Sequence, residues 1–165
     1  MRHILLVEDE RAIRTMIEIA LEEEEGYRVI SASGLDEAEA MLEEERPDLL
    51  VLDAVVPGAK VFPKRSGMEF VTFALARDVP VVLMTGFTDL ADVLEGVKFP
   101  LLRKPFGIDA LCDAIGAALA RPQENRRRVR DALDYLLHHR AEFAALLERL
   151  GELGATIGPG SRRRK

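Results

Sequence analysis

The stretch Leu49-Leu50-Val51-Leu52-Asp53 is a short apolar run that ends in a carboxylate. Other apolar runs of the chain are followed by polar residues in the same way. One carboxylate after a buried strand is common, whereas several polar groups at the ends of successive parallel strands indicate a site. The polar residues that follow the other runs are Glu8 and Asp9, Thr85, and Lys104 with Pro105.

Apolar runs alternate along the chain with segments whose apolar residues recur at helical spacing. This alternation is typical of a parallel sheet that is covered by helices on both faces. Because crossovers between such strands are right-handed and short, few arrangements are open. We therefore predict an α/β fold, a doubly wound five-stranded parallel sheet in the flavodoxin-like order 2-1-3-4-5, followed by a C-terminal helix. The predicted strands are His3–Val7, Tyr27–Ser31, Leu49–Asp53, Val79–Met84 and Phe99–Leu102.

Helices are predicted between these strands and after the last one. The first is expected to end at Gly26, and Ser33 with Asp36 resembles a capping arrangement for the second. Ser66 is placed to cap the third. The later predicted helices cover about Gly67–Ala76, Asp89–Glu95 and Ile108–Ala120.

The composition of the 165 residues fits one ordinary domain with an appendage. Residues 1–120 carry 12 Lys and Arg against 23 Asp and Glu, whereas residues 121–165 carry 11 against 6. The acidic part argues against non-specific nucleic-acid binding by the main domain. The single cysteine, Cys112, excludes an internal disulfide and suits a reducing compartment. No apolar run approaches the roughly 20 residues of a membrane span, so we expect a cytoplasmic protein without a membrane partner.

In the predicted strand order, the ends of the first and third strands bring Glu8, Asp9 and Asp53 together. Three carboxylates in one cleft repel one another, so they should bind a cation or have a raised pKa. Oxygen ligands favour Mg²⁺, which would neutralise an incoming phosphoryl group and leave Asp53 free to attack it. Lys104 can reach the phosphoryl oxygens as a point charge, and Thr85 can offer a hydroxyl.

Four segments around these residues resemble the receiver domains of two-component response regulators, the CheY-like family. The resemblance covers about residues 1–120. It implies that Asp53 accepts phosphate from a histidine kinase or a histidine phosphotransfer protein. It also implies that Thr85 and Lys104 read the phosphoryl group and shift the face of the fourth and fifth strands into an active state. The segments are Val7-Glu8-Asp9-Glu10, Leu52-Asp53, Met84-Thr85-Gly86 and Lys104-Pro105-Phe106.

The same resemblance implies a set of metal ligands. Asp9 and Asp53 would bind Mg²⁺ directly, and the backbone carbonyl of Val55 would complete the protein ligands. Glu8 would act partly through water, and its longer side chain is a mild departure from the aspartate of the family pattern. The expected chemistry is self-catalysed phosphoryl transfer and hydrolysis, not that of an enzyme with another substrate. A small-molecule phosphatase would usually have an acid where Val55 stands.

Two departures from the family pattern concern the surroundings of the acidic residues. Nine residues, Gly58–Ser66, separate Pro57 from Gly67, where the family commonly has three. The added segment 59–65 is either a tolerated surface insertion or a source of cations that changes the phosphoryl lifetime or the choice of kinase. Leu101 takes the place of an aromatic switch residue, so its coupling to Thr85 is expected to differ. The cations of the insertion are Lys60, Lys64 and Arg65.

Residues 121–153 predict a helical extension, with one helix from about Gln123 to Leu150 or beyond. Its apolar residues recur at alternating spacings of three and four, which predicts a heptad-like seam. The seam could pack on the receiver, on a second copy as a dimer, or on another protein. The seam is interrupted by one polar position, His139, and its residues are Val129, Ala132, Leu136, His139, Phe143, Leu146, Leu150, Leu153 and Ile157.

The output of the protein is predicted to be a protein interaction with an unknown downstream target. The basic clusters Arg126-Arg127-Arg128 and Arg162-Arg163-Arg164-Lys165 leave a DNA-binding regulator as an alternative, although nucleic acid is the less favoured partner. A phosphate sink with fast turnover is a further alternative. Residues 154–165 are expected to be a disordered basic tail.

Overall fold

The computed structural model describes residues 1–24, 26–54, 67–139, 141–143, 145–146 and 148–149. Its sheet has five strands, all parallel, in the order β2-β1-β3-β4-β5, which confirms the predicted fold class. The strands are β1 (His3–Val7), β2 (Arg28–Ala32), β3 (Leu49–Asp53), β4 (Val81–Thr85) and β5 (Leu101–Arg103). The helices are α1 (Arg11–Glu24), α2 (Leu35–Glu45), α3 (Gly67–Leu75), α4 (Thr88–Gly96), α5 (Ile108–Ala120) and α6 (Pro122–His138).

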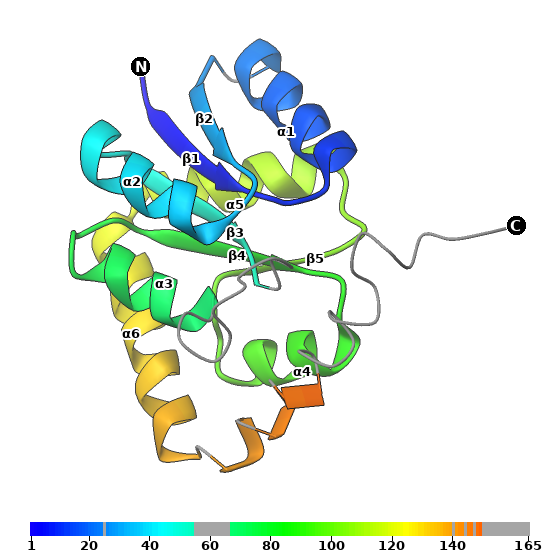
Figure 1. The fold of residues 1–165 in the computed structure, drawn as a ribbon, viewed down its shortest axis with the longest axis vertical. Coiled ribbons are helices and arrows are strands. Elements are labelled where there is room, and N and C mark those ends of the chain that lie inside the picture. Colours follow the sequence, from blue (N-terminus) through cyan, green and yellow to red (C-terminus); the bar gives the residue numbers. More distant parts are fainter. Residues whose placement is uncertain (25, 55–66, 140, 144, 147, 150–165) are drawn as a thin grey trace, which may run out of the picture.

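Helices cover both faces of the sheet and divide the interior into two apolar cores (Figure 1). Successive strand residues point to opposite faces, so β1 gives Ile4 and Leu6 to one core and Leu5 and Val7 to the other. Helices α1 and α5 close the first core, and α2, α3, α4 and α6 close the second. Every residue of β3 and β4 is buried, so the ends of these two strands have fixed positions.

Strands β4 and β5 both begin two residues later than predicted, and both end one residue later. The preceding residues close the helices instead, in an arrangement typical of helix C-termini. Val79 donates its N–H to the Ala74 carbonyl at 3.1 Å, with Asp78 in the left-handed region at a φ of 58°. Phe99 closes α4 in the same way on the Leu94 carbonyl at 2.9 Å. Strand β2 begins and ends one residue later than predicted.

The predicted pairing of Ser33 with Asp36 at the start of α2 is wrong. The helix begins at Leu35, and its N-cap is Gly34, which has no capping side chain. The N–H and hydroxyl of Ser33 lie 3.2 and 3.4 Å from the Glu37 carboxylate. The partner is therefore one residue further along, because the helix begins later than the spacing suggested.

The single long helix predicted for the extension is also wrong. Helix α6 ends at His138, and helical residues resume at 141. A straight helix rises about 1.5 Å per residue and would carry Leu146 roughly 12 Å beyond the end of α6. With the break, Leu146 is buried in the same core as Val129, Ala132 and Leu136 of α6. The described part of the seam thus packs on the receiver, with the exception of His139, which is exposed.

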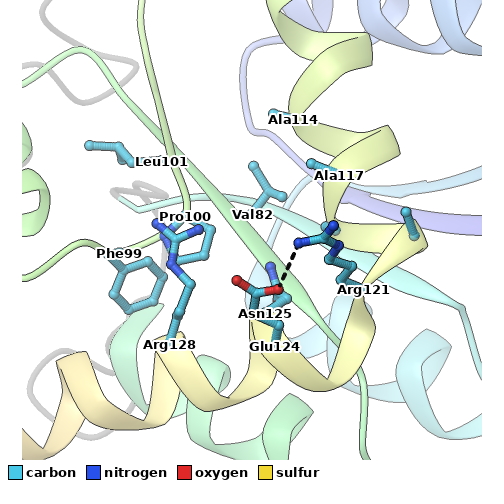
Figure 2. Close-up of a pocket in the computed structure, with 12 residues that line it drawn as sticks. Val82, Phe99, Pro100, Leu101, Ala114, Ala117, Arg121, Glu124, Asn125 and Arg128 are labelled. Carbon is cyan, nitrogen blue, oxygen red and sulfur yellow. Dashed lines mark hydrogen bonds and ion pairs between the residues drawn. The ribbon is translucent and has the colours of Figure 1, made fainter.

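A polar contact fastens α6 to the sheet. Asn125 is buried, and its side-chain amide accepts the N–H of Val81 at 2.8 Å and donates to the Val81 carbonyl at 3.0 Å. Figure 2 shows Asn125 on α6 beside the strand that carries Val82. The first residue of β4 is therefore held by the extension.

Several predicted features fall outside the described residues: Val55, the insertion 59–65, Ser66 as a cap, and the chain from residue 150 onward. Within the described part of the chain, no helix is long and apolar enough to cross a membrane.

Candidate functional site

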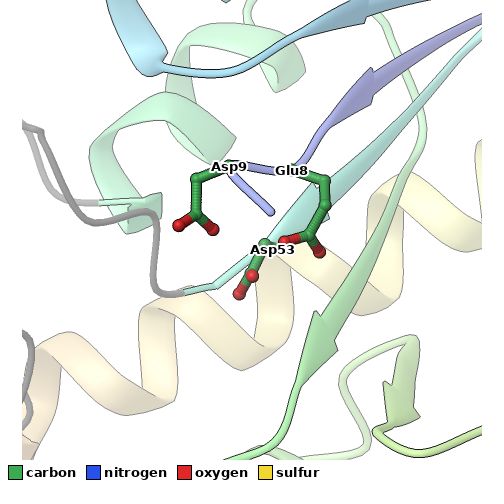
Figure 3. A group of neighbouring side chains, drawn as sticks. All are labelled: Glu8, Asp9 and Asp53. Atoms are coloured by element: carbon green, nitrogen blue, oxygen red, sulfur yellow. The ribbon is translucent and has the colours of Figure 1, made fainter. Parts of the chain in front are cut away.

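Three carboxylates meet at the carboxyl edge of the sheet, where β1 and β3 end side by side. Glu8, Asp9 and Asp53 each place an oxygen within 4.8 Å of the others (Figure 3). The pairing of Val7 with Leu52 puts Glu8 level with Asp53. Glu8 and Asp53 are buried and Asp9 is partly exposed. We call these three residues the acidic cluster.

Lys104 supplies the positive charge that these carboxylates need. Its Nζ donates to Glu8 at 2.6 Å and to Asp53 at 2.9 Å. The backbone N–H of Lys104 donates to the Thr85 carbonyl at 2.8 Å, which continues the ladder between β4 and β5 and positions the side chain. Burial alone would lower the pKa of Lys104, but the charge of Asp53 and the hydrogen bonds outweigh burial and raise that pKa. The lysine is therefore a firmly charged partner of Asp53.

Asp9 is the member of the acidic cluster whose ionised form is disfavoured in the folded protein. Burial, and next the negative charge of Glu8, raise its pKa from 3.8 to about 6. An ionised Asp9 therefore costs folding free energy at neutral pH. A cation bound at the cluster would offset this cost.

The Asp9→Asn variant is expected to be about 1 kcal/mol more stable than the wild type in EDTA at pH 7. The full pKa shift corresponds to about 3 kcal/mol, and solvent screening of this half-exposed group reduces the effect. Because the folded protein binds the proton more tightly, the wild type regains stability as the pH falls through about 6. Urea unfolding of the wild type and the variant at pH 7 and at pH 4 measures the stability difference and its decrease at low pH.

The matched control for this experiment is Asp113→Asn, which makes the same chemical change on the exposed side of α5. It should change stability little at either pH. An Asp9→Asn variant that is no more stable than the wild type at pH 7 would show that ionised Asp9 does not destabilise the fold.

Thr85 ends β4 at the same edge and is buried. Its hydroxyl oxygen accepts the N–H of Phe87 at 3.1 Å, and this bond shapes the connection into α4. A hydroxyl that accepts a hydrogen bond can still donate its own proton. Thr85 is therefore placed to join the start of α4 to an oxygen bound near Asp53.

The sequence analysis missed Arg14, which holds the loop that carries the acidic pair. Its guanidinium donates to the Glu8 carbonyl at 2.8 Å and to the Asp9 carbonyl at 3.4 Å. An arginine one turn into α1 returns toward the preceding loop because helical side chains lean toward the helix N-terminus. That spacing was the available signal. Arg14 therefore orients the loop through its backbone carbonyls.

The structure thus brings together Glu8, Asp9, Asp53 and Lys104, with Thr85 at the same edge. A profile of the response regulator receiver domain matches residues 4–116. The chain belongs to the response regulator receiver domain family. Its described fold agrees with this, since a receiver domain of Clostridium thermocellum superposes with a TM-score of 0.62 at 28% identity, over 74% of this chain and 98% of that one.

Curated relatives of this receiver include transcriptional regulators. The phosphate regulon transcriptional regulatory protein PhoB of Klebsiella pneumoniae is 35% identical over 127 residues, 73% of this chain and 52% of PhoB. The transcriptional regulatory protein PdtaR of Mycobacterium tuberculosis is 33% identical over 129 residues, 74% of this chain and 59% of PdtaR. The chain therefore spans about half the length of the PhoB proteins that it matches.

Proposed function

We propose that this receiver accepts a phosphoryl group on Asp53 from the phosphohistidine of a histidine kinase or phosphotransfer protein, and that it signals through a protein interaction. The observation that carries the proposal is the Lys104 ammonium, bound at 2.9 Å to the buried Asp53 within an acidic cluster. A carboxylate in this setting is held in one orientation and its charge is balanced. It can therefore act as a nucleophile.

The transfer itself needs positioning and charge balance more than acid–base chemistry. An Asp53 oxygen would attack phosphorus in line with the P–N bond, so that an O–P bond forms as P–N breaks and the imidazole leaves with a proton from solvent. The Lys104 ammonium would move from the Asp53 carboxylate to the phosphoryl oxygens, where the negative charge then lies. Thr85 would donate its hydroxyl to another of these oxygens. Attack by water on phosphorus would later restore Asp53 and release inorganic phosphate.

The donor set of the acidic cluster fits Mg²⁺, because it consists of carboxylate oxygens that lie close together. We propose that Asp9 and Asp53 bind the ion directly with the Val55 carbonyl, and that Glu8 acts through water. When bound, Mg²⁺ would neutralise charge on the phosphoryl group. The contact between Lys104 and Asp53 would loosen at the same time, since both cations use the same carboxylate.

Treatment with acetyl phosphate and Mg²⁺, followed by intact-mass measurement, tests the proposal. The wild type should gain the mass of one phosphoryl group, and Asp53→Asn should gain none. Asp89→Asn makes the same change on an exposed residue of α4 and should behave as the wild type. An equal adduct on Asp53→Asn would overturn the assignment of Asp53.

We propose no enzymatic activity beyond phosphoryl transfer and hydrolysis at Asp53.

The oligomeric state is measured in the same samples, because a phosphorylation-dependent homodimer is one form that the output can take. An Asp53-dependent adduct without a change in assembly would remove the dimer and leave an interaction with another protein as the output. Rapid loss of the phosphoryl group with no phosphorylation-dependent partner would favour a phosphate sink.

A second candidate function is control of transcription through DNA contact, supported by the names of PhoB and PdtaR. Its route in this chain would be the arginine-rich clusters at residues 126–128 and 162–164. Phosphate contacts of this kind weaken steeply with salt. Salt-dependent binding to duplex DNA that is lost when residues 162–165 are removed would support it, and no binding at low salt would exclude it.

A further inference from the structure

A hollow lies between α5, α6 and the start of β5, away from the acidic cluster (Figure 2). It has a volume of about 490 Å³, which is within the usual range for ligand sites. Small or apolar side chains form its floor, among them Val82, Pro100, Leu101 and Ala117. Asn125 and Arg128 of α6 line it as well, so the hollow exists only because α6 packs there.

The hollow opens on an unpaired edge of the sheet. Strand β5 is the last strand of the described sheet. Its ladder with β4 uses the Pro100 carbonyl, bound to the Leu83 N–H at 2.9 Å, and the Lys104 N–H. Alternate residues of a strand point their backbone groups to opposite sides. The N–H and carbonyl of Leu101 therefore point away from β4, toward the open side where the hollow lies.

Two arginines give this edge a positive charge. Arg121 pairs with Glu124 at 3.5 Å, whereas Arg128 donates to the Lys98 carbonyl at 3.2 Å and forms no ion pair within the described residues. The lining therefore carries an excess of one positive charge in a receiver that is otherwise strongly acidic. Figure 2 shows Arg128 beside Pro100 and the Arg121–Glu124 pair on the other side of the hollow.

We propose that this hollow binds an extended, acidic segment of a partner protein as an added strand on β5. The backbone of the segment would pair with Leu101, its small apolar residues would contact the floor, and a carboxylate would pair with Arg128 or Arg121. A second copy of this chain is a poorer occupant, because edge-to-edge pairing would bring two positive hollows together. The proposal specifies a surface for the protein-interaction output proposed above, and it needs no phosphate on Asp53.

A displayed library of random octapeptides, selected on the intact protein, provides the probe. The enriched peptides should be acidic and should bind Leu101→Pro about tenfold more weakly or worse. Proline removes the outward N–H and leaves the ladder with β4 intact. Arg128→Glu should weaken the same peptides to a similar extent. Arg130→Glu, on an exposed residue of α6 that does not line the hollow, should bind as the wild type does.

Thermal unfolding establishes whether each variant is folded. If Leu101→Pro does not fold, Arg128→Glu still tests the proposal. Peptides that bind equally to both variants, or a library from which none is enriched, would overturn the proposal. A wild-type dimer that Leu101→Pro abolishes would instead show that a second copy occupies the edge. Asp53→Asn should retain peptide binding, so failure of phosphorylation and failure of this surface are separate results.

Discussion

The Lys104→Met variant is expected to be about 3 kcal/mol less stable than the wild type in EDTA at pH 7. Methionine keeps most of the length of the side chain but removes its charge. Glu8 and Asp53 are then left side by side, 1% and 7% exposed, without the ammonium that binds both. Removing one partner of a buried ion pair is costly because the other charge stays buried.

The pH range of this effect follows from the direction of the Lys104 pKa. The folded-state pKa lies above 10.5, the ordinary value for lysine. The stability that Lys104 contributes is therefore complete below about pH 10.5 and is lost only as the pH rises through the folded-state pKa. A urea titration at pH 7 thus measures the whole difference.

Magnesium should reverse part of the loss, because it supplies positive charge to the same carboxylates. The variant is expected to bind Mg²⁺ about tenfold more tightly than the wild type, in which Lys104 competes for Asp53. Calorimetric titration with Mg²⁺ measures this change. Lys98→Met, on an exposed residue, is the matched control and should alter neither quantity. Equal destabilisation with and without Mg²⁺ would show that Lys104 acts through packing rather than charge.

The fold and the candidate site follow from short-range rules, and this is why the sequence predicts them well. Apolar runs that end in a polar residue predict strands whose ends meet at one edge. Asp53, Lys104 and Thr85 were found from that rule alone. Helix α5 was predicted to run from about Ile108 to Ala120, and the structure has these bounds, because Gly107 precedes the helix and Arg121-Pro122 follows it.

The features that the sequence analysis missed depend on contacts between distant segments. Val79 is β-branched and was predicted to begin β4, yet it closes α3, because its N–H donates to the Ala74 carbonyl. The helical pattern of the extension has one polar position, His139, and continues beyond it, yet helix α6 ends at His138 and Leu146 is buried on the receiver. Both of these helix ends depend on contacts that a short stretch of sequence does not show. The role of Asn125 was missed for the same reason, although it lies four residues before Val129 and so continues the apolar seam.

The Asn125→Ala variant is expected to lower the free energy of unfolding by about 3 kcal/mol. The ladder between β4 and β5 explains why this one amide matters. Two residues before Leu83, a parallel ladder would have Val81 donate to Lys98 and accept from the N–H of residue 100. That residue is Pro100, which has no N–H. Asn125 on α6 supplies a donor in place of the absent Pro100 N–H, and an acceptor in place of the Lys98 carbonyl, which accepts from Arg128 instead.

Alanine at position 125 would leave a buried N–H and a buried carbonyl of Val81 without partners, and each such group costs about 1–3 kcal/mol. Asn125→Asp keeps an acceptor for the N–H but loses the donor, so it should also destabilise. The matched control is Gln123→Ala, two residues earlier on the exposed side of α6. Urea unfolding measures all three variants, and a loss at Asn125 no larger than that at Gln123 would mean that water can replace the amide. A large loss would instead make α6 part of the receiver's folding unit, since the strand that ends in Thr85 would then depend on a side chain of the extension at its first residue.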